Sequence, residues 1–151
     1  MKNDIYFPSN IDEFIIDLKN FNICIDQEFN IDKLSLYLGI QCYLTTKILK
    51  ENYCISFSNL KNIVRINYAV DKIKLGFLRL HTVEALAIEC GYSERVHFSK
   101  TFKLFTGMTV VQADNYANNN VTASIPVSAH FQKVHRLRKI ILNYEFENDR
   151  Q

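Results

Sequence analysis

The most informative chemistry in this sequence is a row of cationic and hydrogen-bonding side chains in residues 95–103. Phe98 and Phe102 recur within this row at helical spacing, together with Leu104 or Phe105, and so predict a helix with one buried face. Its opposite face would then carry Arg95, His97, Ser99, Lys100 and Lys103. Such groups on the outside of a helix suit base edges and phosphates, so the pattern indicates a helix that enters a DNA major groove.

The residues before this helix predict a shorter helix and a tight turn. Thr82 is the expected N-cap of the shorter helix, and residues 85–87 supply its small apolar face. Gly91 stands where a helix ends in the left-handed conformation that a Cβ atom opposes. Ser93 is the expected N-cap of the recognition helix over 94–104. Two helices around such a turn form a helix-turn-helix unit.

The segment from Ala87 to Thr109 resembles the second helix-turn-helix of the AraC/XylS family of bacterial transcription regulators. It follows the pattern A-x-x-x-G-[FY]-S-x-x-x-x-F-S-[RK]-x-F-K-x-x-T-G-M-T. The resemblance implies base contacts from this helix and from an earlier recognition helix. We expect Lys103 to face the DNA backbone. The residues that the resemblance assigns to base contacts are Arg95, Val96, His97, Ser99 and Lys100 on the later helix and Tyr43, Thr46 and Lys47 on the earlier one.

The earlier unit is predicted over residues 31–52. Leu34 and Leu38 would form the apolar face of its first helix, Gly39 would end that helix, and a recognition helix would follow over 41–52. Residues 57–73 predict one long amphipathic helix that connects the two units. In that helix the run from Arg65 to Ala69 resembles the family's R-[IV]-x-x-A pattern, so the resemblance covers 31–112.

Several positions depart from the family pattern. Thr45 stands where the family usually has a core Leu, and the family's Tyr-Leu pair is displaced by one residue to Tyr43-Leu44. Cys54 replaces a helix-ending Gly, and Val110 replaces a Pro. Residues 113–114 are Ala-Asp instead of Tyr-Arg. We expect the first unit to be the less stable one, because Thr45 would bury an unpartnered hydroxyl, unless the helix shifts so that Leu44 fills the pocket.

The whole chain is predicted to be all-α, with two homeodomain-like helix-turn-helix subdomains, a linker helix and extra helices at both ends. The two Pro and four Gly among 151 residues are too few for the turns of a β-sandwich. Residues 1–30 would be a leading segment with a helix over 11–25, and 31–112 the tandem DNA-binding domain. Residues 113–151 would hold a polar linker from Asn118 to Pro126 and an amphipathic tail helix, for which core packing, partner binding and phosphate contact all remain open.

Composition and motifs exclude several classes of protein. No 18-residue apolar run is present, and the N-terminus lacks the apolar segment of a signal peptide, so we expect a cytoplasmic protein. The four cysteines lack zinc-site spacing and are expected to be reduced thiols, mostly buried. No catalytic or phosphate-loop motif occurs, so we expect neither an enzyme nor a metal or cofactor. Residues 31–116 carry eleven Lys or Arg and seven acids, an excess of +4 that coincides with the predicted DNA-binding region.

Two functions remain open at this level. The first is a sequence-specific DNA-binding transcription regulator whose partners are double-stranded DNA and RNA polymerase, acting alone or as the output end of a longer sensor. The second is a protein-interaction module on the same fold, which pairs with another regulator or the polymerase and binds DNA weakly. The departures in the first unit and the extra tail helix favour the second.

Overall fold

The fold is a chain of short helices around one long helix. The computed structural model describes residues 17–18 and 22–119, and within these ranges it contains helices and no strand. The elements are α2 (Ile31–Leu38), α3 (Cys42–Tyr53), α4 (Phe57–Lys74), η1 (Phe77–Arg79), α5 (Val83–Glu89), α6 (Arg95–Thr106) and α7 (Val110–Asn119). The all-α prediction is confirmed for the described residues.

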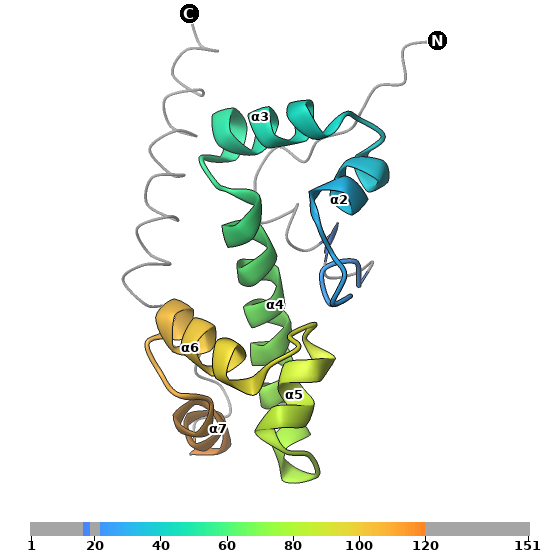
Figure 1. The fold of residues 1–151 in the computed structure, drawn as a ribbon. Coiled ribbons are helices and arrows are strands. Elements are labelled where there is room, and N and C mark those ends of the chain that lie inside the picture. The colour runs from blue at the N-terminus through green and yellow to red at the C-terminus, as the bar shows by residue number, and fades with distance from the viewer. Residues whose placement is uncertain (1–16, 19–21, 120–151) are drawn as a thin grey trace, which may run out of the picture.

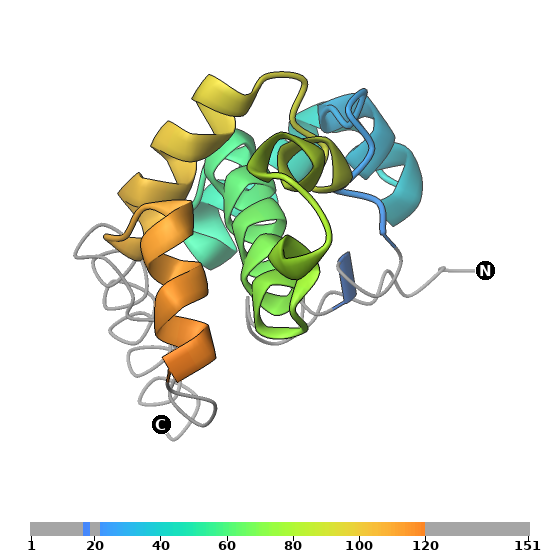
Figure 2. The same ribbon diagram turned by 90° about the horizontal axis from the view of Figure 1, so that it is seen from below.

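The helices form two groups at the two ends of α4 (Figure 1). Helices α2 and α3 pack on each other at one end, and α5, α6 and α7 surround the other end. Seen along α4, helix α7 lies beside α6 and closes the second group (Figure 2). The two predicted recognition helices correspond to α3 and α6, and the predicted connecting helix corresponds to α4, each within two residues at either end.

Glycines end the first helix of both units, as predicted. Gly39 has a φ of 71° and Gly91 a φ of 89°, in the left-handed region where a side chain is disfavoured. Gly91 is required for a second reason. A Cβ atom on it would lie 2.6 Å from the carbonyl oxygen of Ile25, so the turn of the second unit touches the backbone of the segment before α2.

Arg65 holds that segment in place. Its side chain is buried in the middle of α4, where Nε donates to the carbonyl oxygen of Cys24 at 2.6 Å and Nη2 donates to that of Asp26 at 2.8 Å. The guanidinium also lies over the ring of Tyr92, 5.2 Å from its centroid. Desolvation lowers the pKa of Arg65, and the guanidinium stays charged because its ordinary value is so high. One side chain therefore joins residues 24–26, α4 and the turn of the second unit.

Thr45 does face the core of the first unit, but its hydroxyl has partners. Oγ1 of Thr45 lies 2.8 Å from Oγ of Ser35 and 3.2 Å from the carbonyl oxygen of Gln41. Ser35 donates to the carbonyl oxygen of Ile31, so the single hydrogen of the Thr45 hydroxyl is donated either to Oγ of Ser35 or to the carbonyl oxygen of Gln41. The expectation of an unpartnered hydroxyl is wrong. The alternative of a shifted helix is wrong too, because Leu44 is 36% exposed while Thr45 is 1% exposed.

The end of α3 keeps the left-handed conformation without its glycine. Cys54 has a φ of 51°, and its amide donates to the carbonyl oxygen of Leu49. The backbone is therefore that of a glycine-capped helix, and the β-carbon of Cys54 strains it.

The segments that flank the two units differ in part from the predictions. Leu18 is buried, but residues 22–25 form turns, so the helix predicted over 11–25 does not reach its predicted end. Asn118 and Asn119, predicted to begin a polar linker, instead form the end of α7. The predicted tail helix and the rest of the linker lie outside the described residues.

The four thiols are free and differ in environment. Cys24 and Cys90 are buried, and desolvation raises the pKa of each to about 12. Cys54 is exposed and Cys42 is half-buried, so the expectation of mostly buried thiols holds for two of the four. Because the thiolate is the reactive form, Cys24 and Cys90 should resist alkylation in the folded protein.

Replacement of Cys54 by Gly should stabilise the protein. Relief of the left-handed strain should raise the free energy of unfolding by about 0.5–1 kcal/mol, as measured by urea denaturation. Cys54→Ala is the matched control, because it removes the sulfur and keeps the β-carbon. An equal gain in both variants would show that the sulfur, and not the backbone strain, matters.

Loss of the Thr45 hydroxyl should destabilise the first unit. Thr45→Val keeps the shape of the side chain, and we expect it to cost about 1 kcal/mol of unfolding free energy. In a Ser35→Ala background the same change should cost less, because the hydrogen bond between the two hydroxyls is already lost. Strict additivity of the two substitutions would contradict the partnership.

Candidate nucleic-acid interface

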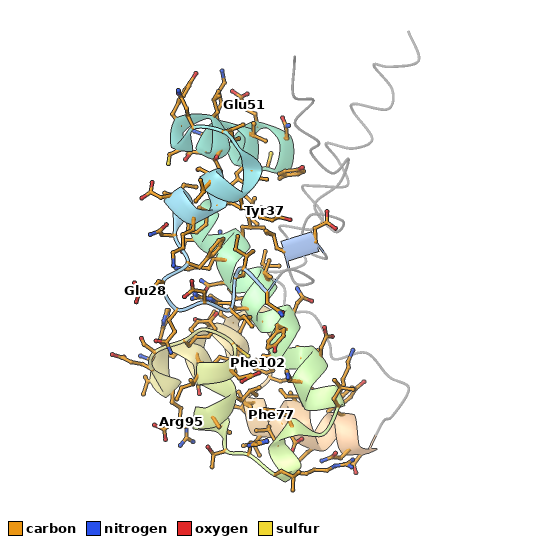
Figure 3. All side chains as sticks on the ribbon, turned by 90° about the vertical axis from the view of Figure 1, so that its right-hand side faces the viewer. Glu28, Tyr37, Glu51, Phe77, Arg95 and Phe102 are labelled. Carbon is orange, nitrogen blue, oxygen red and sulfur yellow. The ribbon has the colours of Figure 1, made fainter. Side chains whose placement is uncertain are left out.

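The buried face of α6 fixes which of its residues point outward. Phe98, Phe102 and Phe105 are buried, while Leu104 is 54% exposed, which decides between the two predicted core positions. Tyr92 packs against Phe98 with ring centroids 5.3 Å apart. Figure 3 shows Phe102 in the interior and Arg95 at the outer edge of the molecule. The aromatic core thus holds α6 with its polar face outward.

The outward residues of α6 lie in two rows of four-residue spacing, which places the members of each row side by side on a helix. One row consists of Arg95, Ser99 and Lys103, of which Ser99 is partly buried and the other two are exposed. The second row contains Val96 and Lys100, both exposed. These five of the six predicted residues of α6 are thus on the surface side of the helix, but they do not share one environment.

The first row borders an open hollow of about 300 Å³. Helix α6 contributes Arg95, Ser99, Lys100 and Lys103 to its wall. Val83 at the start of α5 and residues 109–111 at the start of α7 complete it. Among the residues that line this hollow none is acidic, so its wall has a strongly positive character.

The side chain of His97 is exposed, but its ring packs against the buried ring of Tyr92. It meets the ring of Tyr92 edge to face, with centroids 5.5 Å apart. Tyr92 is itself fixed by the hydrogen bond that its hydroxyl donates to Oδ1 of Asn62 at 2.9 Å. The contact with a buried, anchored ring limits how far the His97 side chain can swing.

Helix α3 presents the second group of predicted residues. Tyr43, Thr46 and Lys47 are all exposed, and their spacing of three and four places them on one face. The hydroxyl of Thr46 donates to the carbonyl oxygen of Cys42 at 3.1 Å. Since a hydroxyl has a single hydrogen, Thr46 offers a DNA base only its acceptor lone pairs.

The entry into α6 differs from the prediction by one residue. The N-cap is Glu94 instead of Ser93, and its side chain makes no capping hydrogen bond. By contrast Thr82 caps α5 as predicted, since its Oγ1 accepts from the amide of Ala85 at 3.1 Å. The helix begins one residue later than predicted, because Ser93 still belongs to the turn that follows Gly91.

The cap at the start of α7 was not predicted from the sequence. Thr109 and Gln112 cap this helix reciprocally: Thr109 Oγ1 accepts from the amide of Gln112 at 3.1 Å, and Gln112 Oε1 accepts from the amide of Thr109 at 2.9 Å. A Thr followed three residues later by Gln is the sequence signal for such a capping box. This signal predicts a helix N-terminus at Thr109, which the structure places next to the polar face of α6.

The part of the chain that the structure describes holds no group of three side chains suited to bind a metal ion. None of its helices has both the length and the apolar character of a bilayer span.

The arrangement of helices is similar to that of several solved structures. A DNA-binding transcriptional dual regulator from Escherichia coli K-12 is 22% identical, with a TM-score of 0.62, over 76% of this chain and 97% of that one. An AraC-type DNA-binding domain protein from Chromobacterium violaceum is 16% identical, with a TM-score of 0.57, over 70% of this chain and 94% of that one. The C-terminal domain of the response regulator yesN from Fusobacterium nucleatum is 21% identical, with a TM-score of 0.52, over 69% and 97%.

The chain has the fold of an AraC-type DNA-binding domain. No protein-family model and no curated protein matches the sequence. In the AraC-type fold of this chain, α3 and α6 are the second helices of the two helix-turn-helix units. Both expose the predicted side chains, except Ser99, which is partly buried.

Two substitutions with the same chemistry should have different effects on the second unit. Thr82→Ala removes an observed cap and should lower the free energy of unfolding by about 1 kcal/mol. Ser93→Ala removes no cap and should change it by less than about 0.5 kcal/mol. Thermal or urea denaturation of both variants measures the difference. Equal losses would show that Ser93 caps α6 in solution.

Proposed function

We propose that this protein is a sequence-specific DNA-binding transcription regulator. The observation that carries the proposal is the presence, on an AraC-type fold, of two outward-facing helices, α3 and α6, with hydrogen-bonding and cationic side chains. In this proposal the two helices enter successive segments of the major groove on one side of the DNA. We propose residues 31–112 as the core of the DNA-binding domain, completed by the rest of α7.

The chemistry of each exposed side chain indicates which group of the DNA it suits. Val96 is 63% exposed and suits a thymine methyl group, and Lys100 in the same row suits guanine. On α3, Lys47 suits guanine or a phosphate, and the acceptor-only hydroxyl of Thr46 suits an amino group of adenine or cytosine. Tyr43 is 65% exposed and offers an aromatic surface with a hydroxyl at its end.

The two recognition helices would have to match the pitch of DNA. Successive major-groove openings on one side lie about 34 Å apart, so a rigid pair of helices contacts both only when the spacing fits or the DNA bends. The hydrogen bonds of Arg65 support a fixed relation between the units. A binding site with two half-sites about 10 base pairs apart is the expected consequence.

A second candidate function, a protein-interaction module, rests on three exposed apolar side chains. Leu75 and Leu80 flank η1 and are 84% and 87% exposed, and Ile88 on α5 is 54% exposed. Side chains of this kind suit contact with a protein such as RNA polymerase or another regulator. The two candidate functions are compatible, because these three side chains belong to neither recognition helix.

Selection from a random DNA library tests the proposal. The protein should enrich a motif with two half-sites and bind it at least about 1,000-fold more tightly than random duplex at physiological salt. Its affinity should fall steeply with salt, because binding releases counterions from the phosphates. Lys47→Ala and Lys100→Ala should each weaken binding to the motif by about 1–3 kcal/mol, while Lys74→Ala, a charge-matched change outside both helices, should not.

No enrichment over the starting library would contradict sequence-specific recognition. If the protein instead binds a partner protein with little salt dependence, and Leu75→Ser or Leu80→Ser abolishes that binding, the interaction-module function is the correct one.

A further inference from the structure

The hollow between α6 and the start of α7 gives part of the interface a role different from the one that the sequence suggests. We propose that it binds a backbone phosphate of the DNA, and that Arg95 is one of the phosphate ligands instead of a base-contacting residue. This inference rests on the proposed function, and it reassigns one residue of the predicted set.

The first support is the charge of the wall. Arg95, Lys100 and Lys103 line the hollow together with the hydroxyl-bearing Ser99. Within residues 17–18 and 22–119, the observed ion pairs are Lys33–Asp26 and Lys72–Glu89, so no described carboxylate neutralises these three cations. Three unpaired cations on one concave surface repel one another, and an anion in the hollow would remove that repulsion.

The second support is the helix end that closes the hollow. The first amides of a helix lack partners within it. Of the amides at this end, those of Thr109 and Gln112 are taken by the reciprocal cap, and that of Ala113 donates to the carbonyl oxygen of Thr109. The amides of Val110 and Val111 remain, and the α7 dipole adds positive potential where they lie.

Val110 is a feature of this chain in particular. The AraC/XylS pattern that the sequence resembles has proline at this position, and proline has no amide hydrogen. This chain therefore adds a donor at the start of α7 that the pattern lacks. The side chain of Val110 is buried, which fixes the helix end against the core while its backbone stays beside the hollow.

The position of Arg95 in the first row completes the argument. Arg95, Ser99 and Lys103 border the hollow, whereas Val96 lies in the neighbouring row and does not line it. A phosphate held by the first row would set the depth of α6 in the groove. Contact with base edges then falls to Val96 and His97, which do not line the hollow, and to Lys100, which lines it from the second row.

Fluorescence anisotropy with a random-sequence duplex tests the assignment. Arg95→Ala and Lys103→Ala should weaken binding to random and selected duplexes by the same factor, and each should lower the slope of log K against log salt by about one. Lys74→Ala, with the same change in charge outside the hollow, should keep the wild-type slope. Val110→Pro should weaken binding severalfold without changing the slope, because it removes a neutral donor, and it should fold normally because proline suits the first helical position.

Other outcomes would overturn the proposal. If Arg95→Ala binds random duplex as the wild type does and loses only the selected sequence, Arg95 contacts a base. If NMR titration shifts the Val110 and Val111 amides with inorganic phosphate but not with duplex, the hollow binds a free anion. Failure of the proposed function is distinguishable from both, because then the wild-type protein itself would bind neither duplex.

Discussion

The buried guanidinium of Arg65 is the interaction on which the placement of both helix-turn-helix units depends. A cation taken out of water is costly unless hydrogen bonds replace the lost hydration. Here the carbonyl oxygens of Cys24 and Asp26 supply them, and the face of Tyr92 covers the group. The cation can therefore be buried only if residues 24–26 and the turn of the second unit are in their observed places.

Other contacts extend this constraint to the first unit. The carboxylate of Asp26 pairs with Lys33 of α2 at 2.8 Å while its carbonyl oxygen accepts from Arg65. Phe29 packs against Phe57 at the start of α4, with ring centroids 5.3 Å apart. Residues 22–30 are thus held by α4 at one side and by α2 at the other. These contacts fix the position of α2, and with it α3, relative to α4 and α6.

Local patterns were enough to predict the helices and the turns between them. Apolar spacing located α4 and α6, and Gly39 and Gly91 located the turns, because these signals depend on residues within one or two turns of helix. Helix α3 was located from its place after the Gly39 turn and from the family resemblance. The exposure of Arg95, His97, Lys100 and Lys103 followed from the same periodicity, whereas the other interface residues were predicted from the family resemblance. The choice between Leu104 and Phe105 needed the structure, because both spacings are compatible with one helical face.

Contacts between distant residues could not be predicted in the same way. The hydroxyl of Thr45 looked unpartnered because its partner Ser35 lies on another helix. Arg65 matched a family pattern, but its acceptors lie 41 and 39 residues earlier in the chain. The hollow beside α6 is formed by three helices, and no single stretch of sequence contains it. Each of these features arises from packing between elements, which a periodic pattern does not encode.

The most direct test of this account is the distance between the two recognition helices with and without Arg65. Spin labels would be attached to cysteines introduced at two exposed positions, by Glu51→Cys on α3 and Leu104→Cys on α6. The two accessible native thiols would be removed by Cys42→Ser and Cys54→Gly. Cys24 and Cys90 stay unlabelled, since burial raises the pKa of each to about 12. Double electron–electron resonance spectroscopy should give one narrow distribution of distances between the two labels in this background and in the Arg79→Met control. Arg65→Met should broaden it while circular dichroism shows the helices intact. An unchanged narrow distribution in Arg65→Met would contradict the account.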